Sequence, residues 1–312
     1  MKLSLLYRGS LASCNYGCTY CPFAKRTDTR EQLARDRAEL ARFTARLASL
    51  TAHRWRILFT PWGEALVRSW YRRAVVRLSH LPHVESVAVQ TNLSGPLDWV
   101  AECAPGKPAF WATYHPTEVA RAAFVAKAVR LHEAGVRISV GMVAVPDALD
   151  EILALRRELP ASIYLWLNAQ QPRRRPYTAD ELRTLAAVDP QFPLTAQSRR
   201  TFGLPCRTGE SVFSVDGAGT ITRCHFVDEP LGNLHDDDWE SALRPRLCPN
   251  RRCDCFVGWS HLPSLGLERS FGDGLLERIP KEFVASAAGV AHHAAELTSP
   301  LESCDGTPSR SR

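Results

Sequence analysis

The stretch CNYGCTYC, residues 14–21, places Cys14, Cys18 and Cys21 within eight positions at CxxxCxxC spacing. It follows a short apolar run, Leu3 to Tyr7, that predicts a β-strand. Three thiolates on one tight loop can hold three irons of a 4Fe-4S cluster, whereas a purely structural iron-sulfur or zinc site usually has a fourth protein ligand. The spacing therefore predicts a cluster whose fourth iron is open to a substrate or cofactor.

Two other interpretations of this stretch need consideration. The run from Leu11 to Cys14 resembles a lipobox, in which Cys14 would carry the lipid of a bacterial lipoprotein. A secretory signal needs an apolar stretch of about 7 to 15 residues, and Arg8-Gly9-Ser10 interrupts the apolar run too early. Zinc stays an alternative on spacing alone, because two or three of these thiols could join a distant ligand.

Length and composition limit the class of protein. With 312 residues and 45% hydrophobic content, the chain can bury one large core, or a core and a smaller module. No apolar run approaches the roughly 18 residues that span a bilayer, so we expect no membrane association. Ten cysteines in a long chain without a signal peptide indicate metal binding in a reducing cytosol. These thiols predict a cytoplasmic protein. The charge of +6 is spread along the chain and does not by itself indicate nucleic acid, so we expect no nucleic-acid partner.

Short apolar runs alternate with helical periodicity through the first half of the chain. The expected strands are residues 3–7, 55–60, 87–91, 110–114, 138–145 and 163–167. The expected helices are residues 33–50, 66–78, 118–134 and 152–159, with a short helix between the third and fourth strands. Gly135 is expected to end the third long helix as its C′ glycine. Six alternating strand-helix units predict an α/β fold with parallel strands, an open partial (β/α)6 barrel of the TIM type.

The CxxxCx(aromatic)C motif after a first strand, with Tyr20 as its aromatic residue, resembles the radical S-adenosylmethionine (SAM) superfamily. This resemblance implies the same partial barrel and a 4Fe-4S cluster on Cys14, Cys18 and Cys21 that binds SAM. It also implies reductive cleavage of SAM to a 5′-deoxyadenosyl radical, and an external electron donor such as flavodoxin or ferredoxin. We expect no separate leader-peptide domain ahead of Cys14.

Ligands of parallel α/β sheets gather at the carboxyl ends of the strands. After the second strand, Gly63-Glu64 stands where the family has Gly-Gly-Glu, a segment that receives the SAM ammonium group, although Trp62 replaces the first glycine. The other candidate SAM contacts are Tyr20, Asn92 after the third strand, Thr113 and His115 after the fourth, and Asn168 after the sixth. For each of them an ordinary strand-end cap or turn is the alternative.

A second group of cysteines lies beyond residue 200. Cys206 precedes a predicted hairpin whose Asp216-Gly217 turn brings it near Cys224. Three further thiols follow: Cys248, Cys253 and Cys255. Their order resembles the SPASM or shorter twitch extension of radical SAM enzymes, which implies an auxiliary 4Fe-4S cluster held by four of the five thiols. A zinc ion with four thiolate ligands is the alternative.

The predicted division of the chain follows from these motifs. It runs 1–172 for the partial barrel, 173–200 for a linker and helix, 201–262 for the cysteine-rich domain and 263–312 for a C-terminal extension with a disordered tail. Arg173-Arg174-Arg175 is expected to be a solvated linker. We assign no role to Cys103, Cys304 or His292-His293.

The sequence therefore predicts a radical SAM enzyme whose 5′-deoxyadenosyl radical abstracts hydrogen from a substrate. A peptide or protein side chain is the first substrate class, a small metabolite the second and an RNA base the third. A non-catalytic iron-sulfur or zinc binding protein remains an alternative. The Gly63-Glu64 match favours the enzyme, because a metal-binding module needs no SAM-binding strand end.

Overall fold

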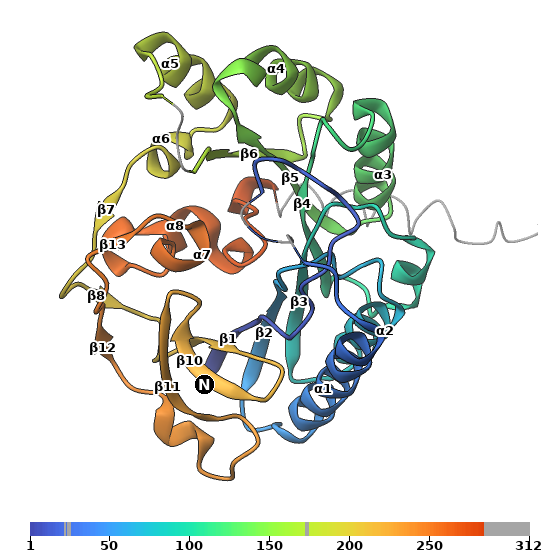
Figure 1. Ribbon diagram of the computed structural model, residues 1–312, viewed down its shortest axis with the longest axis vertical. Helices are drawn as coiled ribbons and strands as arrows, with labels where there is room; N and C mark the ends of the chain where they lie inside the picture. The colour runs from blue at the N-terminus through green and yellow to red at the C-terminus, as the bar shows by residue number, and fades with distance from the viewer. Residues whose placement is uncertain (22, 24–25, 172–174, 284–312) are drawn as a thin grey trace, which may run out of the picture.

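The computed structural model describes residues 1–21, 23, 26–171 and 175–283, and it centres on one curved sheet (Figure 1). The sheet has nine strands in the order β11-β10-β9-β1-β2-β3-β4-β5-β6. Strands β1 to β6 are parallel to their neighbours throughout. Within the described residues the two edge strands, β11 and β6, do not pair, so the barrel is open. The fold confirms the predicted partial (β/α)6 arrangement.

The six parallel strands and the helices that connect them have the following bounds. The strands are β1 (Lys2–Tyr7), β2 (Arg54–Phe59), β3 (Val84–Thr91), β4 (Pro108–Thr113), β5 (Arg137–Ala144) and β6 (Tyr164–Ala169). The helices are α1 (Arg30–Ser49), α2 (Ser69–Ser79), η1 (Asp98–Glu102), α3 (Arg121–Glu133), η2 (Pro146–Ala148), α4 (Leu149–Glu158), α5 (Ala179–Val188) and α6 (Phe192–Thr195).

The C-terminal part is built from short elements. They are β7 (Arg199–Arg200), β8 (Pro205–Cys206), β9 (Val212–Val215), β10 (Thr220–Cys224), β11 (Val227–Asn233), η3 (Trp239–Ala242), β12 (Arg246–Leu247) and β13 (Arg252–Cys253). Four helical turns follow: α7 (Phe256–Trp259), η4 (Pro263–Leu265), α8 (Leu267–Phe271) and η5 (Gly272–Gly274). No helix in the described part of the chain is long and apolar enough to cross a membrane.

Local sequence signals set the helix ends. Thr29 and Gln32 form a capping box that starts α1. Helix α3 begins at Arg121, later than the expected Glu118, because Glu118 belongs to a turn in which its N–H donates to the His115 carbonyl (3.0 Å). Gly135 has a φ of 72° and follows α3 as the expected C′ glycine.

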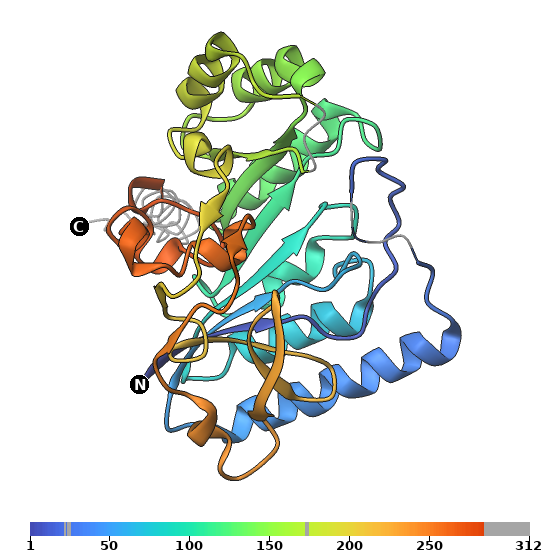
Figure 2. The same ribbon diagram turned by 60° about the vertical axis from the view of Figure 1, so that its left-hand side comes forward.

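Two cores lie on the two faces of the sheet. The convex face packs against the long helices through residues such as Phe43 and Leu47 of α1. The concave face carries Trp111 and Trp166, which pack with Phe256 of α7 and other residues of the C-terminal segment. Figures 1 and 2 show α7 and α8 inside the curve of the sheet, on the side opposite α1. The C-terminal segment therefore fills the hollow that an open barrel leaves.

The cysteine-rich segment shares the sheet of the barrel. Strand β9 pairs in parallel with β1, in a register that places Ser4 opposite Val212, and β10 returns antiparallel to β9. Phe213 and Ile221 of this hairpin belong to the same core as the barrel helices. The hairpin is thus an extension of the main sheet, and the domain boundaries at 172 and 201 stay predictions.

Several residues named from the sequence lie outside the described part of the chain. They are Arg173, Arg174, His292, His293 and Cys304, together with the C-terminal tail that was expected to be disordered. Arg175 is described, and its guanidinium donates to both carboxylate oxygens of Glu181 (2.8 and 2.6 Å). This arginine of the predicted linker is therefore tied to α5.

Gly141 tests the packing of the concave face. A β-carbon on this β5 residue would lie 1.9 Å from ring carbons of Trp166, which is 1% exposed. We expect Gly141→Ala to lower the free energy of unfolding by about 1–3 kcal/mol, because the ring has no room to move. Urea denaturation measures the change. Gly17→Ala, where no atom lies within 4 Å of the added carbon, is the control. Equal stability of both variants would contradict the position of Trp166.

Candidate active site

A cavity of about 240 Å³ opens at the carboxyl ends of the parallel strands. All ten residues that the sequence assigned to the cluster and to SAM line it: Cys14, Cys18, Tyr20, Cys21, Gly63, Glu64, Asn92, Thr113, His115 and Asn168. They come from the loop after β1 and from β2, β3, β4 and β6 or the residues that follow them. The structure therefore brings together side chains that are up to 154 positions apart in the sequence, from Cys14 to Asn168.

Gly63 makes the closest contact between the cysteine loop and the barrel. The N–H groups of Gly63 and Glu64 donate to the carbonyls of Leu11 and Ser13, both at 3.2 Å. A β-carbon on Gly63 would lie 2.0 Å from the Ser13 carbonyl oxygen, so only glycine fits there. Trp62, which replaces the first glycine of the family motif, is 46% exposed at the cavity rim and avoids this contact.

Glu64 braces the ends of β2 and β3. One carboxylate oxygen accepts from the Leu66 N–H (3.0 Å) and the Thr91 hydroxyl (2.6 Å), and the other accepts from the Asn92 N–H (2.7 Å). Burial raises the pKa of Glu64, and these three hydrogen bonds oppose the rise. The sequence assigned Glu64 to the SAM ammonium group and did not predict this bracing role.

His115 joins the fourth strand to the cysteine loop. Its Nδ1 lies 3.3 Å from Cys18 Sγ and 2.8 Å from the Tyr20 hydroxyl. The imidazole also stacks on the Tyr20 ring, with centroids 5.9 Å apart and an interplanar angle of 14°. Burial lowers the pKa of His115 to about 4, so the ring is neutral at pH 7. A neutral imidazole whose Nδ1 carries no hydrogen can accept a hydrogen bond from the Tyr20 hydroxyl.

Asn92 approaches the first cysteine from the third strand. Its amide nitrogen lies 3.8 Å from Cys14 Sγ and donates to Asn15 Oδ1 at 3.3 Å. The Ser94 hydroxyl donates to the same Asn15 oxygen (3.1 Å). Asn15 was not predicted as a site residue, because its position between two cysteines of the motif carries no chemical signal of its own.

Asn168 is held by a side chain that the sequence did not reveal. Arg278 is fully buried, and its guanidinium donates to Asn168 Oδ1 at 2.7 Å. The same guanidinium lies 4.7 Å from the Trp166 ring centroid and 4.4 Å from that of Phe256. Arg278 also has a φ of 58°, a left-handed conformation that is uncommon outside glycine. No local pattern in the sequence marks such a long-range contact.

Arg8 is a second residue of the cavity that the sequence did not predict. Its guanidinium donates to the Thr60 carbonyl (3.1 Å) and lies 4.7 Å from the Trp62 ring centroid. Burial lowers the pKa of Arg8 to about 10, so it stays charged at pH 7. The cavity thus contains a fixed positive charge beside an aromatic rim.

The C-terminal thiols are brought together by short strand pairs. Strand β12 pairs with β8, which places Arg246 opposite Cys206 and carries the chain on to Cys248. Arg223 donates to the Leu247 carbonyl (2.5 Å) and so ties the end of β10 to β12. Burial, together with the neighbouring Cys206 and Cys248 thiols, raises the pKa of Cys224 to about 11. The structure thus places Cys224 near Cys206 and Cys248, and their sharing of a metal stays a prediction.

Cys253 and Cys255 differ in what they face. Cys253 lies in β13, and burial, together with the thiols of Cys224, Cys255 and Cys248, raises its pKa to about 12. Cys255 caps α7 and lines the same cavity as the N-terminal cysteines. None of the nine cysteines that the structure describes forms a disulfide bond. Among the described residues, no three His, Cys, Asp or Glu side chains are spaced to hold a single metal ion.

Comparison with known proteins gives a likeness of fold. A scan against protein-family models and a search of curated proteins both find no match. Among solved structures, the chain is similar to polyhistidine-tagged anSMEcpe with bound AdoMet, at 12% identity and a TM-score of 0.55, over 95% of this chain and 94% of that one. It is also similar to native anSMEcpe with bound AdoMet and a Cp18Cys peptide, at 12% identity and a TM-score of 0.52, over 95% and 97% of the two chains.

A further structure, BtrN in complex with AdoMet and 2-DOIA, has a TM-score of 0.38 at 15% identity, over 77% of this chain and 85% of that one. At identities this low, the similarity to anSMEcpe concerns the fold alone. The chain therefore has the fold of radical SAM enzymes, as the cysteine motif predicted.

Glu64 offers a test of the cavity wall in the protein without metal. In Glu64→Gln one carboxylate oxygen becomes an amide NH2, which cannot accept a hydrogen bond. At least one of the three donors, the Leu66 N–H, the Thr91 hydroxyl and the Asn92 N–H, then loses its buried acceptor. We expect a loss of about 1–3 kcal/mol in the free energy of unfolding, measured by urea denaturation. The exposed Glu133→Gln variant controls for the loss of charge. If Glu64→Gln were as stable as the control, the bracing role would be wrong.

Proposed function

We propose that the protein is a radical SAM enzyme. A 4Fe-4S cluster on Cys14, Cys18 and Cys21, once reduced, supplies the electron that cleaves SAM to a 5′-deoxyadenosyl radical, which abstracts hydrogen from the substrate. The observation that carries this proposal is the convergence of all ten assigned residues on one cavity. A metal-binding protein without SAM chemistry has no need for polar residues from four further strand ends around its thiols.

The residues around the N-terminal thiols fit such a group. The three cysteines come from one loop and no fourth protein thiol of that loop closes the set, which suits a cluster with one open iron. Asn92 and His115 lie within 4 Å of Cys14 and Cys18 sulfurs, where they can orient the ligands. Trp111 and Trp166 line the deeper cavity wall and exclude water from it.

We further propose that Cys206, Cys224, Cys248 and Cys253 hold an auxiliary 4Fe-4S cluster and that Cys255 is the spare thiol. Besides burial, the thiols of Cys206 and Cys248 raise the pKa of Cys224, and those of Cys224, Cys248 and Cys255 raise the pKa of Cys253, so all five thiols lie near one another. The choice of Cys255 as the spare thiol rests on its position, because it lines the cavity beside Arg8. A zinc ion with the same four thiolate ligands is the alternative.

A peptide or protein side chain is the proposed substrate class. The cavity mouth carries three exposed aromatic side chains, Phe23 (39%), Trp62 (46%) and Phe226 (41%), which offer an apolar surface beyond the space for SAM. Such a surface suits an extended chain better than a small metabolite or a single RNA base, which remain alternatives. The anSMEcpe structure with a bound peptide has the same fold.

The reaction needs an electron donor and reduced thiols. We propose an external carrier such as flavodoxin or ferredoxin as the donor. Nine cysteines without a disulfide in the described part of the chain suit a reducing compartment, and we propose the cytoplasm.

The first test is the reductive cleavage of SAM. The protein is reconstituted anaerobically with iron and sulfide, then given dithionite and SAM, and 5′-deoxyadenosine is measured by mass spectrometry. We expect product from the parent and none from the variant with Cys14, Cys18 and Cys21 changed to Ala. Cys103→Ala, which removes a buried thiol of the helix-side core, should keep the parent's activity. Undiminished product from the triple variant would end the radical SAM proposal.

Metal analysis tests the second thiol set. We expect about eight irons in the reconstituted parent and about four in either the N-terminal triple variant or a Cys206→Ala/Cys224→Ala variant. Cys255→Ala should keep about eight irons if Cys255 is the spare thiol. A zinc site predicts a different result, about four irons and one zinc ion in the parent, with the zinc lost in the double variant.

A further inference from the structure

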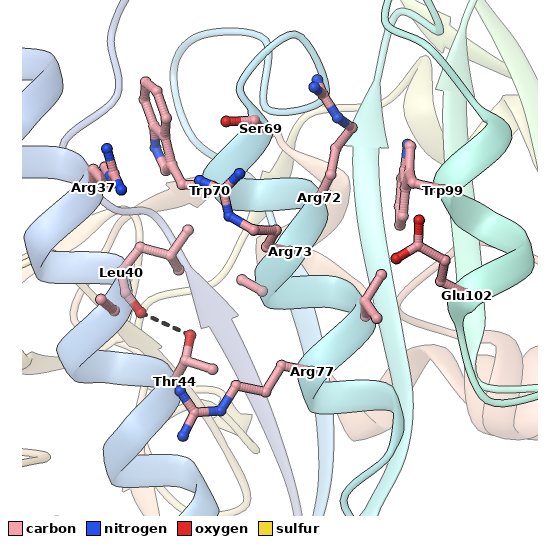
Figure 3. A pocket seen from close by; sticks show the side chains of 13 residues that line it. Arg37, Leu40, Thr44, Ser69, Trp70, Arg72, Arg73, Arg77, Trp99 and Glu102 are labelled. Carbon is pink, nitrogen blue, oxygen red and sulfur yellow. Dashed lines mark hydrogen bonds between the residues drawn. The ribbon is translucent and has the colours of Figure 1, made fainter.

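A groove of about 630 Å³ lies on the outer face of the molecule, over α2 and between α1 on one side and η1 on the other (Figure 3). Two tryptophans, Trp70 and Trp99, and four arginines line it. The arginines are Arg37 of α1 and Arg72, Arg73 and Arg77 of α2. Glu102 is the single acidic residue of the lining. We call this site the arginine groove.

The positive charge of the arginine groove is not balanced locally. Helix α2 contains three arginines and no acidic residue. Arg37, Arg73 and Arg77 are exposed, and within the described residues no carboxylate forms an ion pair with them. Arg72 donates to the Leu66 carbonyl (2.6 Å), and burial and the charge of Arg73 lower its pKa. A partner surface with negative charge would complement this groove.

The nearest acid of α1 is turned inward. Asp36 is 1% exposed, and its carboxylate accepts from the Trp70 indole N–H (2.7 Å) and the Tyr71 hydroxyl (3.0 Å). The same carboxylate accepts from the Ser10 N–H at 3.3 Å. Asp36 therefore forms no ion pair with the arginines of the groove, and it connects the groove wall to the segment that leads to Cys14.

A second contact ties the groove to the cysteine loop. Arg68, which precedes α2, donates to the Ser13 hydroxyl (3.1 Å), and its guanidinium lies 5.8 Å from the Trp70 ring centroid. Ser13 directly precedes Cys14. Figure 3 shows Trp70 and Ser69 at one end of the groove and Arg77 at the other. The Trp70 end of the groove is thus bonded to the chain that holds the first cluster ligand.

We propose that an acidic one-electron carrier protein of the flavodoxin or ferredoxin type docks in the arginine groove. The inference rests on the proposed function, because each SAM cleavage consumes one electron that no residue of the cavity supplies. The carrier loses one electron and the cluster on Cys14, Cys18 and Cys21 gains it, and no bond or proton is exchanged. Arginine and tryptophan, the residues of this groove, are also the side chains that contribute most at protein interfaces.

The test compares two reductants in one protein. In the variant Arg37→Gln/Arg73→Gln/Arg77→Gln three exposed charges are lost, while glutamine keeps the helix propensity. We measure 5′-deoxyadenosine formation driven by subsaturating reduced flavodoxin and, separately, by dithionite. The flavodoxin-driven rate should fall about tenfold or more, because electrostatic steering is lost. The dithionite-driven rate should equal the parent's, because a small reductant needs no docking surface.

A matched variant controls for net charge. Arg157→Gln/Arg244→Gln/Arg269→Gln removes three exposed charges outside the groove that, within the described residues, form no ion pair, and both of its rates should match the parent's. Added salt should lower the flavodoxin-driven rate of the parent and of this control more steeply than that of the groove variant. Equal flavodoxin-driven rates in the parent and the groove variant would overturn the inference, and so would equal losses with both reductants.

Binding without turnover separates this inference from the proposed function. Oxidised flavodoxin is titrated onto the parent and the groove variant. The groove variant should bind it more weakly than the parent does. That result would support docking even if dithionite yielded no 5′-deoxyadenosine, which would count against the radical SAM proposal alone. If flavodoxin did not bind, but an oligouridylate probe bound the parent and not the groove variant, the groove would instead bind nucleic acid, and the inference would be overturned.

Discussion

The contact between the Gly63-Glu64 backbone and the chain before Cys14 is the constraint on which the site depends. A loop with three cysteines has no regular structure of its own, so its position must come from neighbours. The N–H groups after β2 hold it on one side. On the other side, the Asp28 carboxylate accepts from the N–H groups of Ala12 (2.9 Å) and Ser13 (2.8 Å) and from the Ser13 hydroxyl (2.8 Å). The chain that leads to the three cysteines is thus fixed without metal.

Much of the fold and site could be predicted because the relevant rules are local or topological. Alternating strands and helices imply parallel pairing, and parallel strands bring their carboxyl ends to one edge. Residues such as Asn92, Thr113 and Asn168 could therefore be assigned to one cavity from their positions at strand ends. Gly63 was assigned to the segment that receives the SAM ammonium group, whereas the structure shows that glycine is needed there for the close contact with the Ser13 carbonyl.

The parts that could not be predicted depend on contacts between distant segments. Arg278 is 110 positions from Asn168, and only the packing of the C-terminal segment on the concave face brings the two together. In the sequence, Arg8 is a break in an apolar run. In the structure it directly follows β1, and this position places it in the cavity lining. The predicted hairpin formed, but its pairing with β1 depended on that strand having a free edge.

The two thiol sets are linked mechanically, because the C-terminal set adjoins a wall of the cavity that the N-terminal cysteines face. Cys253 ends β13, Cys255 caps α7, and Phe256 and Val257 of that helix line the cavity that the N-terminal cysteines face. Phe256 also packs against Trp111 at 5.3 Å between ring centroids and lies against the Arg278 guanidinium that holds Asn168. A metal on the C-terminal thiols would fix the start of α7 and, through Phe256 and Arg278, the position of Asn168. A metal held there as proposed would therefore shape the cavity whether it is an iron-sulfur cluster or zinc, and this structural effect needs no electron transfer between the two thiol sets.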